Sequence, residues 1–386
     1  MFRLMGKRRG RIVAVADIGS GSAGVAIVST QADGPVRILA AERAMLPFEE
    51  RTAQANISGV IAQLEAAAQK TLAQYAALKN KEVPHVSAAY AVIRAPWSTS
   101  RTVRAASEFP QETRIEEHMI SALAQEALKK DTSSANVFET SVVRVELNGY
   151  PTAQPKDKHA HHIAVSLLVS DCEPSIRSGV SEALSKVFAC PPPILRSGTR
   201  ALLTTLRESA LLPKECFVVN MTSQGTSLIA VRKGVVTDTG TVAEGSRTIL
   251  KRIAGEKMPE ETLALIRMLA LDQCETEACE ATKSALGKVE PELVKVFGEA
   301  MSKMSAVRRL PNALVLSAHE DLSQWLAHFL SRIDFAQFTM TTQPFSARAL
   351  TRDDLSELVS AEGGVKIDAG LSVASALVNI EEHAGA

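Results

Sequence analysis

Residues 12–30 read IVAVADIGSGSAGVAIVST, and this stretch decides the fold. It contains two short apolar runs, at 12–16 and 25–28, separated by a Gly/Ser turn that Asp17 opens. Apolar runs of this length bounded by turn residues are typical of buried strands, and two of them joined by Gly and Ser predict a β-hairpin. The turn is small and rich in backbone N–H groups, so it can approach a phosphate closely.

The same turn matches GxGxxG over residues 19–24, with Glu42 downstream, which is the pattern of a dinucleotide-binding fold. That pattern requires a helix that begins in the loop, so that its N-terminus meets the pyrophosphate. Here a strand-like run and the turn at 33–35 follow, which leaves no room for a helix. The composition therefore disfavours the dinucleotide interpretation. A core hairpin that binds no ligand stays open as an alternative.

The overall composition bounds the class of protein. The chain has 386 residues, of which 46% are hydrophobic but only 4% aromatic, so we expect two domains with mainly aliphatic cores. The formal net charge is zero, which argues against a nucleic-acid-binding protein. No apolar stretch reaches about 20 residues, so no transmembrane helix is expected. The basic N-terminus allows peripheral contact with an anionic membrane surface, although a solvated terminus is the favoured interpretation.

The cysteine pattern predicts a reduced, cytosolic protein, because the five cysteines are scattered and odd in number. Cys274 and Cys279 have no second pair nearby, so a zinc site is not expected. His159, His161 and His162 form a close group, which we interpret as part of a solvated loop.

A second strand–turn–strand unit follows the first at a distance of about 200 residues. Its apolar runs, at 216–220 and 228–231, flank a Thr/Ser/Gln/Gly turn. Two such units indicate two related lobes, and N–H groups from their facing turns would form a concave anion site between the lobes.

The remaining segments are predicted from periodicity and from Pro and Gly breaks. Between 83 and 170 the order is strand, helix, strand, strand, which indicates a small module inserted into the first unit. Its first strand is predicted at 86–92. Other helices are predicted at 52–79, 259–280, 291–304 and 370–380, and a short buried strand at 313–317.

This order of elements resembles the actin-like ATPases of the FtsA and PilM type over nearly the whole chain. Residues 17–22 look like the first phosphate motif of that family, and residues 218–227 lie where the second is expected. Residues 242–245 resemble the connection that follows, and residues 314–318 lie at the adenosine strand. Residues 83–170 look like the SHS2 domain that FtsA and PilM carry in place of actin's usual second subdomain.

The resemblance implies a two-lobed actin-like α/β fold, built of duplicated ribonuclease H-like halves, with an inserted SHS2 module. The implied first lobe has its core at 11–82 and is completed by 171–211. The module spans 83–170. The second lobe spans 212–386, with a helical subdomain at about 256–308.

The resemblance also implies ATP with Mg²⁺ between the lobes, with Asp17 facing the metal. The implied nucleotide-binding residues are Asp17, Gly19, Ser20, Gly21, Ser22, Asn220, Thr222, Ser223, Gln224, Gly225, Thr226, Glu244, Gly245, Ser317 and Ala318. No catalytic residue is implied by the motifs.

Two motifs depart from the family's pattern. The second phosphate motif usually begins with Asp and continues Gly-Gly, whereas these positions hold Asn220, Thr222 and Ser223. Asn cannot offer a negative charge to Mg²⁺, and the Cβ atoms of Thr and Ser stand where backbone should approach. The adenosine strand is followed by Ala318, His319 and Glu320 instead of two glycines. These departures predict a slow ATPase at most, or a protein that has lost the activity.

Three functions are left open. An FtsA-like cell-division scaffold would link a cytoplasmic assembly to the membrane and contact an FtsZ-like filament. A PilM-like type IV pilus assembly protein would bind the cytoplasmic tail of a membrane partner. A nucleotide-free interaction protein would keep the fold without the site. All three place a bacterial protein in the cytoplasm or at the inner face of its membrane, with self-association as a further option and no nucleic-acid partner. A sugar kinase is disfavoured, because no catalytic Asp accompanies the second phosphate loop.

Overall fold

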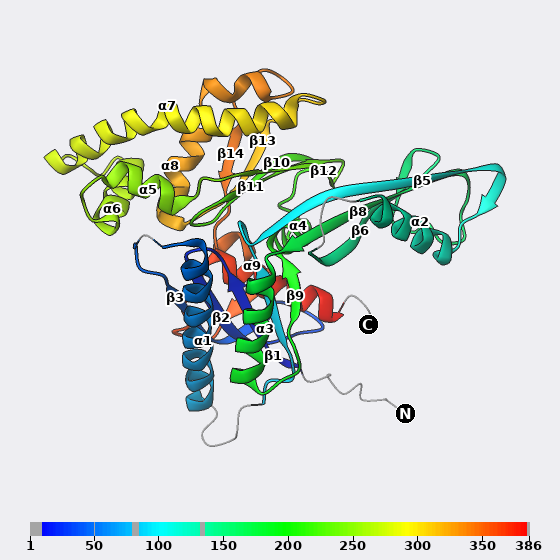
Figure 1. Ribbon diagram of the computed structural model, residues 1–386, viewed down its shortest axis with the longest axis horizontal. Coiled ribbons are helices and arrows are strands. Elements are labelled where there is room, and N and C mark those ends of the chain that lie inside the picture. Colours follow the sequence, from blue (N-terminus) through cyan, green and yellow to red (C-terminus); the bar gives the residue numbers. More distant parts are fainter. Residues whose placement is uncertain (1–9, 50, 79–84, 132–135, 384–386) are drawn as a thin grey trace.

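Three β-sheets organise the protein in the computed structural model, which describes residues 10–49, 51–78, 85–131 and 136–383 (Figure 1). One sheet lies in each of two lobes, which are the lower and upper bodies in Figure 1. The third sheet extends sideways from the junction between the lobes.

The first lobe is built around the predicted hairpin. β1 and β2 pair antiparallel with Asp17 opposite Gly24, and β1 also pairs parallel with β4. These central strands are buried on both faces, which explains why they read as continuous apolar runs. The six strands, in sheet order, are β15 (Val359–Ala361), β3 (Val36–Met45), β2 (Ser22–Ser29), β1 (Ile12–Ile18), β4 (Ala89–Ile93) and β9 (Ile194–Ser197).

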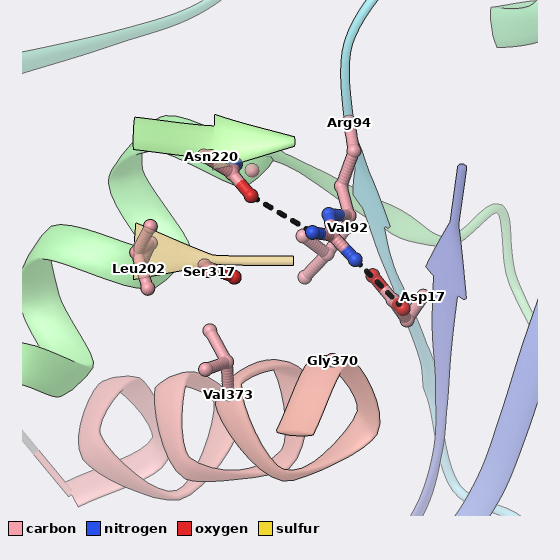
Figure 2. Close-up of a pocket in the computed structure, with 9 residues that line it drawn as sticks. Asp17, Val92, Arg94, Leu202, Asn220, Ser317, Gly370 and Val373 are labelled. Carbon is pink, nitrogen blue, oxygen red and sulfur yellow. Dashed lines mark hydrogen bonds and ion pairs between the residues drawn. The ribbon is translucent and has the colours of Figure 1, made fainter. Parts of the chain in front are cut away.

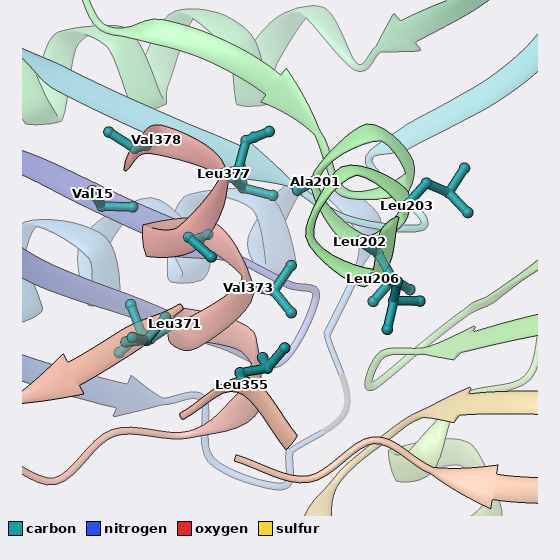
Figure 3. Close-up of a cluster of buried hydrophobic side chains, with 14 of the residues drawn as sticks. Val15, Ala201, Leu202, Leu203, Leu206, Leu355, Leu371, Val373, Leu377 and Val378 are labelled. Atoms are coloured by element: carbon teal, nitrogen blue, oxygen red, sulfur yellow. The ribbon is translucent and has the colours of Figure 1, made fainter. Parts of the chain in front are cut away.

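Helices cover both faces of this sheet, because alternate strand residues point to opposite sides. The bounds are α1 (Ala53–Leu78) and α3 (Pro174–Phe188) on one face, and α4 (Gly198–Glu208) and α9 (Ala369–His383) on the other. On the α4–α9 side, Val15, Leu202 and Leu377 belong to one cluster of buried side chains (Figure 3). This cluster continues into the second lobe through Val218 and Ile229, so the two lobes share one hydrophobic core.

The second lobe repeats the hairpin arrangement. β10 and β11 pair antiparallel, and β10 pairs parallel with β13. In sheet order the strands are β12 (Val235–Val242), β11 (Thr226–Arg232), β10 (Glu215–Met221), β13 (Ala313–Ser317) and β14 (Ser346–Ala349). The helices that follow in the chain are α5 (Ser246–Ala254), α6 (Pro259–Ala270), α7 (Glu277–Ser305) and α8 (Glu320–Leu330), with 3₁₀ turns η1 (Ile333–Phe338) and η2 (Asp353–Leu355).

The third sheet carries one helix on one face. Ile163, Val165 and Leu167 alternate along its central strand and pack under the helix, together with Leu123. In sheet order the strands are β5 (Ser98–Arg114), β8 (His159–Cys172), β6 (Val137–Leu147) and β7 (Tyr150–Thr152), and the helix is α2 (Glu117–Lys130).

Three elements belong to other parts of the fold than the sequence predicted. The strand predicted at 86–92 to open the inserted module is β4, which belongs to the first-lobe sheet. β15 and α9, assigned to a second lobe at 212–386, instead return to the first lobe. Both differences have the same reason: periodicity reports that a segment is buried but does not report which distant sheet buries it.

Two local predictions also need correction. Pro291 lies inside the continuous helix α7, whereas we predicted a break between 280 and 291. Its neighbours Val289 and Leu293 are buried, and this packing outweighs the backbone hydrogen bond that Pro cannot form.

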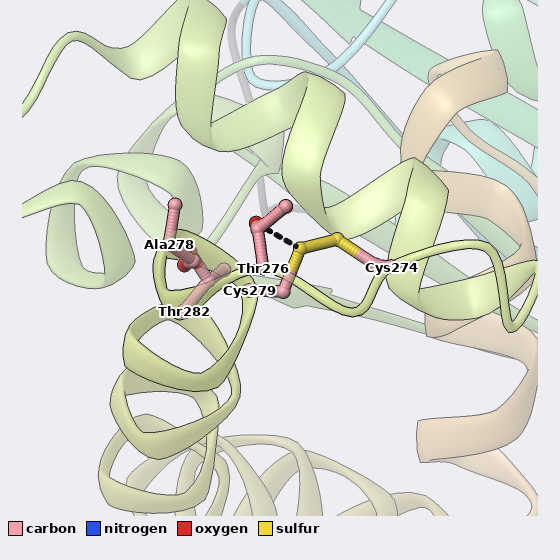
Figure 4. Close-up of a disulfide and its surroundings, with 5 residues drawn as sticks. All are labelled: Cys274, Thr276, Ala278, Cys279 and Thr282. Atoms are coloured by element: carbon pink, nitrogen blue, oxygen red, sulfur yellow. Dashed lines mark hydrogen bonds between the residues drawn. A yellow bond between two sulfur atoms is a disulfide. The ribbon is translucent and has the colours of Figure 1, made fainter.

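Cys274 and Cys279 form a disulfide, so the prediction of reduced cysteines is wrong at this pair (Figure 4). The turn between α6 and α7 brings their Cα atoms to 5.9 Å, within the range for a disulfide. Among the described residues, Cys172, Cys190 and Cys216 are free thiols.

We expect Leu64→Ala to lower the free energy of unfolding by about 2–5 kcal/mol, because it leaves a cavity under α1. Leu64 is fully buried, whereas Leu78 on the same helix is 62% exposed. Leu78→Ala is the matched control and should change stability by less than about 0.5 kcal/mol. Chemical denaturation measures both, and equal losses would contradict the packing described for α1.

Candidate functional site

Asp17 lies at the centre of the molecule, where the end of β1 faces the second lobe. Its side chain is 2% exposed and forms ion pairs with two arginines. Arg43 Nη2 donates to Asp17 Oδ2 at 2.7 Å, and Arg94 Nη1 lies 3.7 Å from the same oxygen (Figure 2 shows the Arg94 contact). A buried carboxylate requires such compensation, because the protein interior solvates charge poorly.

The strand register explains how Arg43 reaches Asp17. Asp17 is opposite Gly24 on β2, and Gly24 is opposite Arg43 on β3. The arginine side chain therefore crosses over β2 at a residue that has no Cβ. A Cβ on Gly24 would lie only 2.7 Å from Arg43 Nη2, so a larger residue would block the crossing.

Asp368, just before α9, is a second partner of Arg43. Arg43 Nε donates to Asp368 Oδ2 at 2.6 Å, and Leu371 N donates to Asp368 Oδ1 at 3.0 Å. Partial burial alone would raise the pKa of Asp368, but the charge of Arg43 and these hydrogen bonds hold the pKa below its usual value. Burial alone would lower the pKa of Arg43, but Asp368 and Asp17 raise it, so the guanidinium stays charged.

Arg94 connects the two lobes. It follows β4 directly, and its Nη2 donates to Asn220 Oδ1 at 2.8 Å at the end of β10 (Figure 2). The cavity that remains between the lobes has a volume of about 10 Å³, room for about one water molecule. It is lined by Asp17, Val92, Arg94, Gly198, Leu202, Asn220, Ser317, Gly370 and Val373.

The two predicted phosphate loops contact each other directly. Gln224 N donates to Ser20 Oγ at 2.9 Å, and Ser20 Oγ lies 3.3 Å from Thr222 Oγ1. A Cβ on Gly21 would lie 2.0 Å from Ser223 Oγ, which shows how closely the loops approach. Asn56 of α1 donates to Gln224 Oε1 at 2.8 Å and reinforces the contact.

Three backbone amides of the facing loops are engaged within the protein. Gly19 N donates to Ser22 O, and Thr222 N donates to Gly225 O. The Gln224 amide donates to Ser20 Oγ, so these three groups of the anion site expected between the turns already have partners.

The other predicted residues border this contact. Ser22 Oγ accepts a hydrogen bond from Arg43, and Thr226 Oγ1 donates to the backbone oxygen of Glu244. The Glu244 carboxylate pairs with Arg252, away from Asp17, and Gly245 N donates to Thr248 Oγ1. Ser317 lines the small cavity, whereas Ala318 packs against the second-lobe core.

Sequence reasoning missed the residues that neutralise and enclose Asp17, namely Arg43, Arg94, Asp368 and Gly370, and also Asn56, which contacts the two loops. Two of them carried a usable signal. Strand register places Arg43 and Asp17 on either side of Gly24, and Arg94 directly follows a buried strand. Asp368 carried no local signal, because its contact with Arg43 spans 325 residues.

The residues present do not fit Mg²⁺-ATP. Mg²⁺ needs oxygen ligands, but the Asp17 carboxylate holds two guanidinium groups and position 220 offers a neutral amide. Ligand pockets typically have volumes of about 300–1,000 Å³, far above the volume of the cavity that Asp17 lines. Among the described residues, no cluster of three or more His, Cys, Asp or Glu side chains is arranged to hold a metal, His159, His161 and His162 included.

Comparison with solved structures supports the fold. A chain of the PilM–PilN type IV pilus biogenesis complex aligns with a TM-score of 0.61 and 13% identity, over 95% of this chain and 98% of that chain. The ethanolamine utilization protein EutJ from Carboxydothermus hydrogenoformans aligns with a TM-score of 0.44 and 9% identity, over 97% and 91% of the two chains. The second score is too low to carry an argument.

No protein-family model and no curated protein matches the sequence. At this level of identity the similarity to the PilM–PilN chain shows the fold alone. The two-lobed, actin-like α/β fold predicted from the sequence is thereby confirmed. None of the helices in the described part of the chain has the length and apolar character needed to cross a bilayer.

We expect Arg43→Met to lower the free energy of unfolding by about 3–5 kcal/mol, because it leaves buried Asp17 short of one counter-charge. Arg37→Met is a matched control on the same strand. Arg37 pairs with Glu362 at the surface, and removal of such a pair should change stability by less than about 1 kcal/mol. Denaturant unfolding of both variants provides the measurement.

The double variant Asp17→Asn/Arg43→Met separates charge from packing. It should be less destabilised than the sum of the two single variants, because the unpaired charge is removed together with its partner. Strict additivity would show that Asp17 and Arg43 are not energetically coupled.

Proposed function

We propose that this chain is a nucleotide-independent interaction protein of the actin-like fold, whose lobes are held together by its own side chains. The observation that supports it most is the pairing of Asp17 with Arg43 and Arg94, because it occupies the carboxylate that the family resemblance assigns to the metal. The protein would then work as a scaffold and not as an ATPase.

Contacts between the lobes support a closed state that needs no ligand. Arg94 donates to Asn220, the Gln224 amide donates to Ser20 Oγ, and Thr222 Oγ1 donates to the backbone oxygen of Ala95. Each buried hydrogen bond contributes about 1 kcal/mol. The hydrophobic cluster shared by α4, α9 and both sheets adds to this closure.

We propose that the partner is a protein at a membrane-associated assembly. The fold similarity to a chain of the PilM–PilN complex favours a type IV pilus role over the FtsA-like division role, since that complex pairs its actin-like chain with a second protein. Under this proposal the chain works in the cytoplasm, at the inner face of the membrane, where it would bind the cytoplasmic tail of a membrane protein.

We also propose that the sheet of β5, β8, β6 and β7 with α2 is an independent, SHS2-type module. Its chain order is one strand, one helix and three strands, and without the three-residue strand β7 this is the strand, helix, strand, strand order that supports the assignment. Its own core, which includes Ile163 and Leu123, is separate from the clusters of the two lobes. The module would then begin near Ser98 and not at residue 83.

We expect no saturable binding of Mg²⁺-ATP to the wild-type protein, by isothermal calorimetry or by a shift in melting temperature. A ligand present at 100 times its Kd would add about 2.7 kcal/mol of stability, so real binding would be visible. Asn220→Asp should not create binding, because Arg43 and Arg94 still hold Asp17.

The control is Asp17→Asn, which removes the carboxylate that the family motif assigns to the metal. Saturable binding by the wild type that this variant loses would overturn the nucleotide-independent proposal. Binding that both proteins retain would place the nucleotide outside this site.

A gene deletion in the source bacterium should remove surface pili, which the wild-type gene restores, and should leave cell length normal. Electron microscopy of pili and light microscopy of cell length provide the measurement. Filamentous cells that keep their pili would instead support the division role.

A further inference from the structure

A polar groove runs between the edge strand β12 and helix α7, outside the cavity that Asp17 lines. Its volume is about 470 Å³, within the range of protein binding sites. Residues 238–243 form one side, and the other is formed by Val296, Glu299, Ala300, Lys303 and Met304 of α7.

The backbone of β12 is available on this side. β12 is the last strand of the second-lobe sheet, and in the described part of the chain no further strand pairs with it. Thr239 N donates to the side chain of Asp238 and not to β11. In an antiparallel ladder, the N–H and C=O groups of successive residues point alternately toward the partner strand and away from it. Thr241 lies two residues after Thr239, so its N–H and C=O groups also point away from β11. An edge of this kind can accept another strand.

Helix α7 and the third sheet limit the groove at two places. A Cβ on Gly240 would lie 2.9 Å from Met304 Sδ, so helix and strand meet closely there. Thr239 Oγ1 donates to the backbone oxygen of Ser100 on β5 at 2.7 Å. The edge beyond Thr239 is exposed at Thr241 and Ala243, which leaves a short open stretch for an incoming chain.

The charges in the groove favour a basic occupant. Asp238, Glu299 and Lys303 line it, and within the described residues none of the three has an ion pair. The groove therefore carries one net negative charge. Its walls partly desolvate Asp238 and raise the pKa of its carboxyl group, which a nearby cation would counteract.

We propose that this groove binds an extended segment of a partner protein, which adds a strand to β12 at Thr241 and places a Lys or Arg side chain beside Asp238 and Glu299. Main-chain hydrogen bonds would supply affinity, and the acidic side chains would supply specificity. This inference rests on the proposed role as an interaction protein, but it does not depend on whether nucleotide binds.

The probe is a library of displayed random heptapeptides, selected against the full-length wild-type protein. Enriched peptides are then synthesised with a fluorophore, and their Kd is measured by anisotropy. We expect the enriched sequences to contain Lys or Arg at one recurring position. Hydrogen exchange should show slower exchange at residues 239–243 when a peptide is bound.

Two variants test the geometry. Thr241→Pro removes the outward N–H, which an edge strand tolerates because that group does not pair with β11. It should weaken binding at least tenfold, whereas Thr241→Val, which keeps the N–H, should change Kd less than twofold. Circular dichroism and melting temperature confirm that both variants fold.

A third variant tests the charge. Glu299→Lys should weaken a basic peptide at least tenfold and should not weaken its Lys→Glu counterpart. No enrichment, or peptides that bind Thr241→Pro as tightly as the wild type, would overturn the groove proposal. A wild-type dimer that Thr241→Pro dissociates would also overturn it, in favour of a second copy of the chain. None of these results bears on the ATP titration, so failure of the groove and failure of nucleotide independence remain distinguishable.

Discussion

The buried charge of Asp17 is the constraint on which the centre of this protein depends. A carboxylate that is 2% exposed persists only with close counter-charges, and removal of one partner is more destabilising than the pair is stabilising. Arg43 comes from β3 over Gly24, and Arg94 comes from the residue after β4. One charge thereby holds the first hairpin, the next parallel strand and, through Asp368, the start of α9 in one arrangement.

Electroneutrality explains the residue at position 220. The cluster contains two carboxylates, Asp17 and Asp368, and two guanidinium groups, Arg43 and Arg94, so its formal charges balance. Asn220 accepts a hydrogen bond from Arg94 without adding charge. An aspartate there would leave one buried negative charge uncompensated unless a cation joined the site. The departure from the family motif at 220 is thus consistent with two arginines in place of a metal.

Local and nonlocal features differ in how far the sequence predicts them. The hairpins at 12–30 and 216–231 depend on neighbouring residues, and their repetition was enough to predict the two-lobed fold. The predicted phosphate loops do face each other, as Ser20 and Gln224 show. The arginine that occupies the site beside them is Arg43. It reaches this place because the strand register lets it cross β2 and because it contacts Asp368. The motif at 17–22 contains no information on that register or on that contact, so it implied a nucleotide where the structure has arginines.

The same limitation explains the placement of α9. Its small residues are buried on nearly all sides, so hydrophobic periodicity carries no direction. The sequence order assigned it to the second lobe, whereas packing against α4 and β1 places it in the first. Its N-terminus then lies beside Asp17, so Asp368 and α9 complete the charge cluster formed by β1, β3 and the residue after β4.

A closed state that needs no ligand has a consequence for binding elsewhere. The proposed closure is set by Asp17, Arg94 and Asn220 and not by a ligand. The third sheet contacts the second lobe through Ser100 and Thr239, so fixed lobes also fix the open edge of β12 next to that contact. A preorganised surface loses less conformational entropy when a partner binds. Under the proposed function, the arginines that pair with Asp17 would therefore favour protein recognition, because they keep that edge in a single geometry.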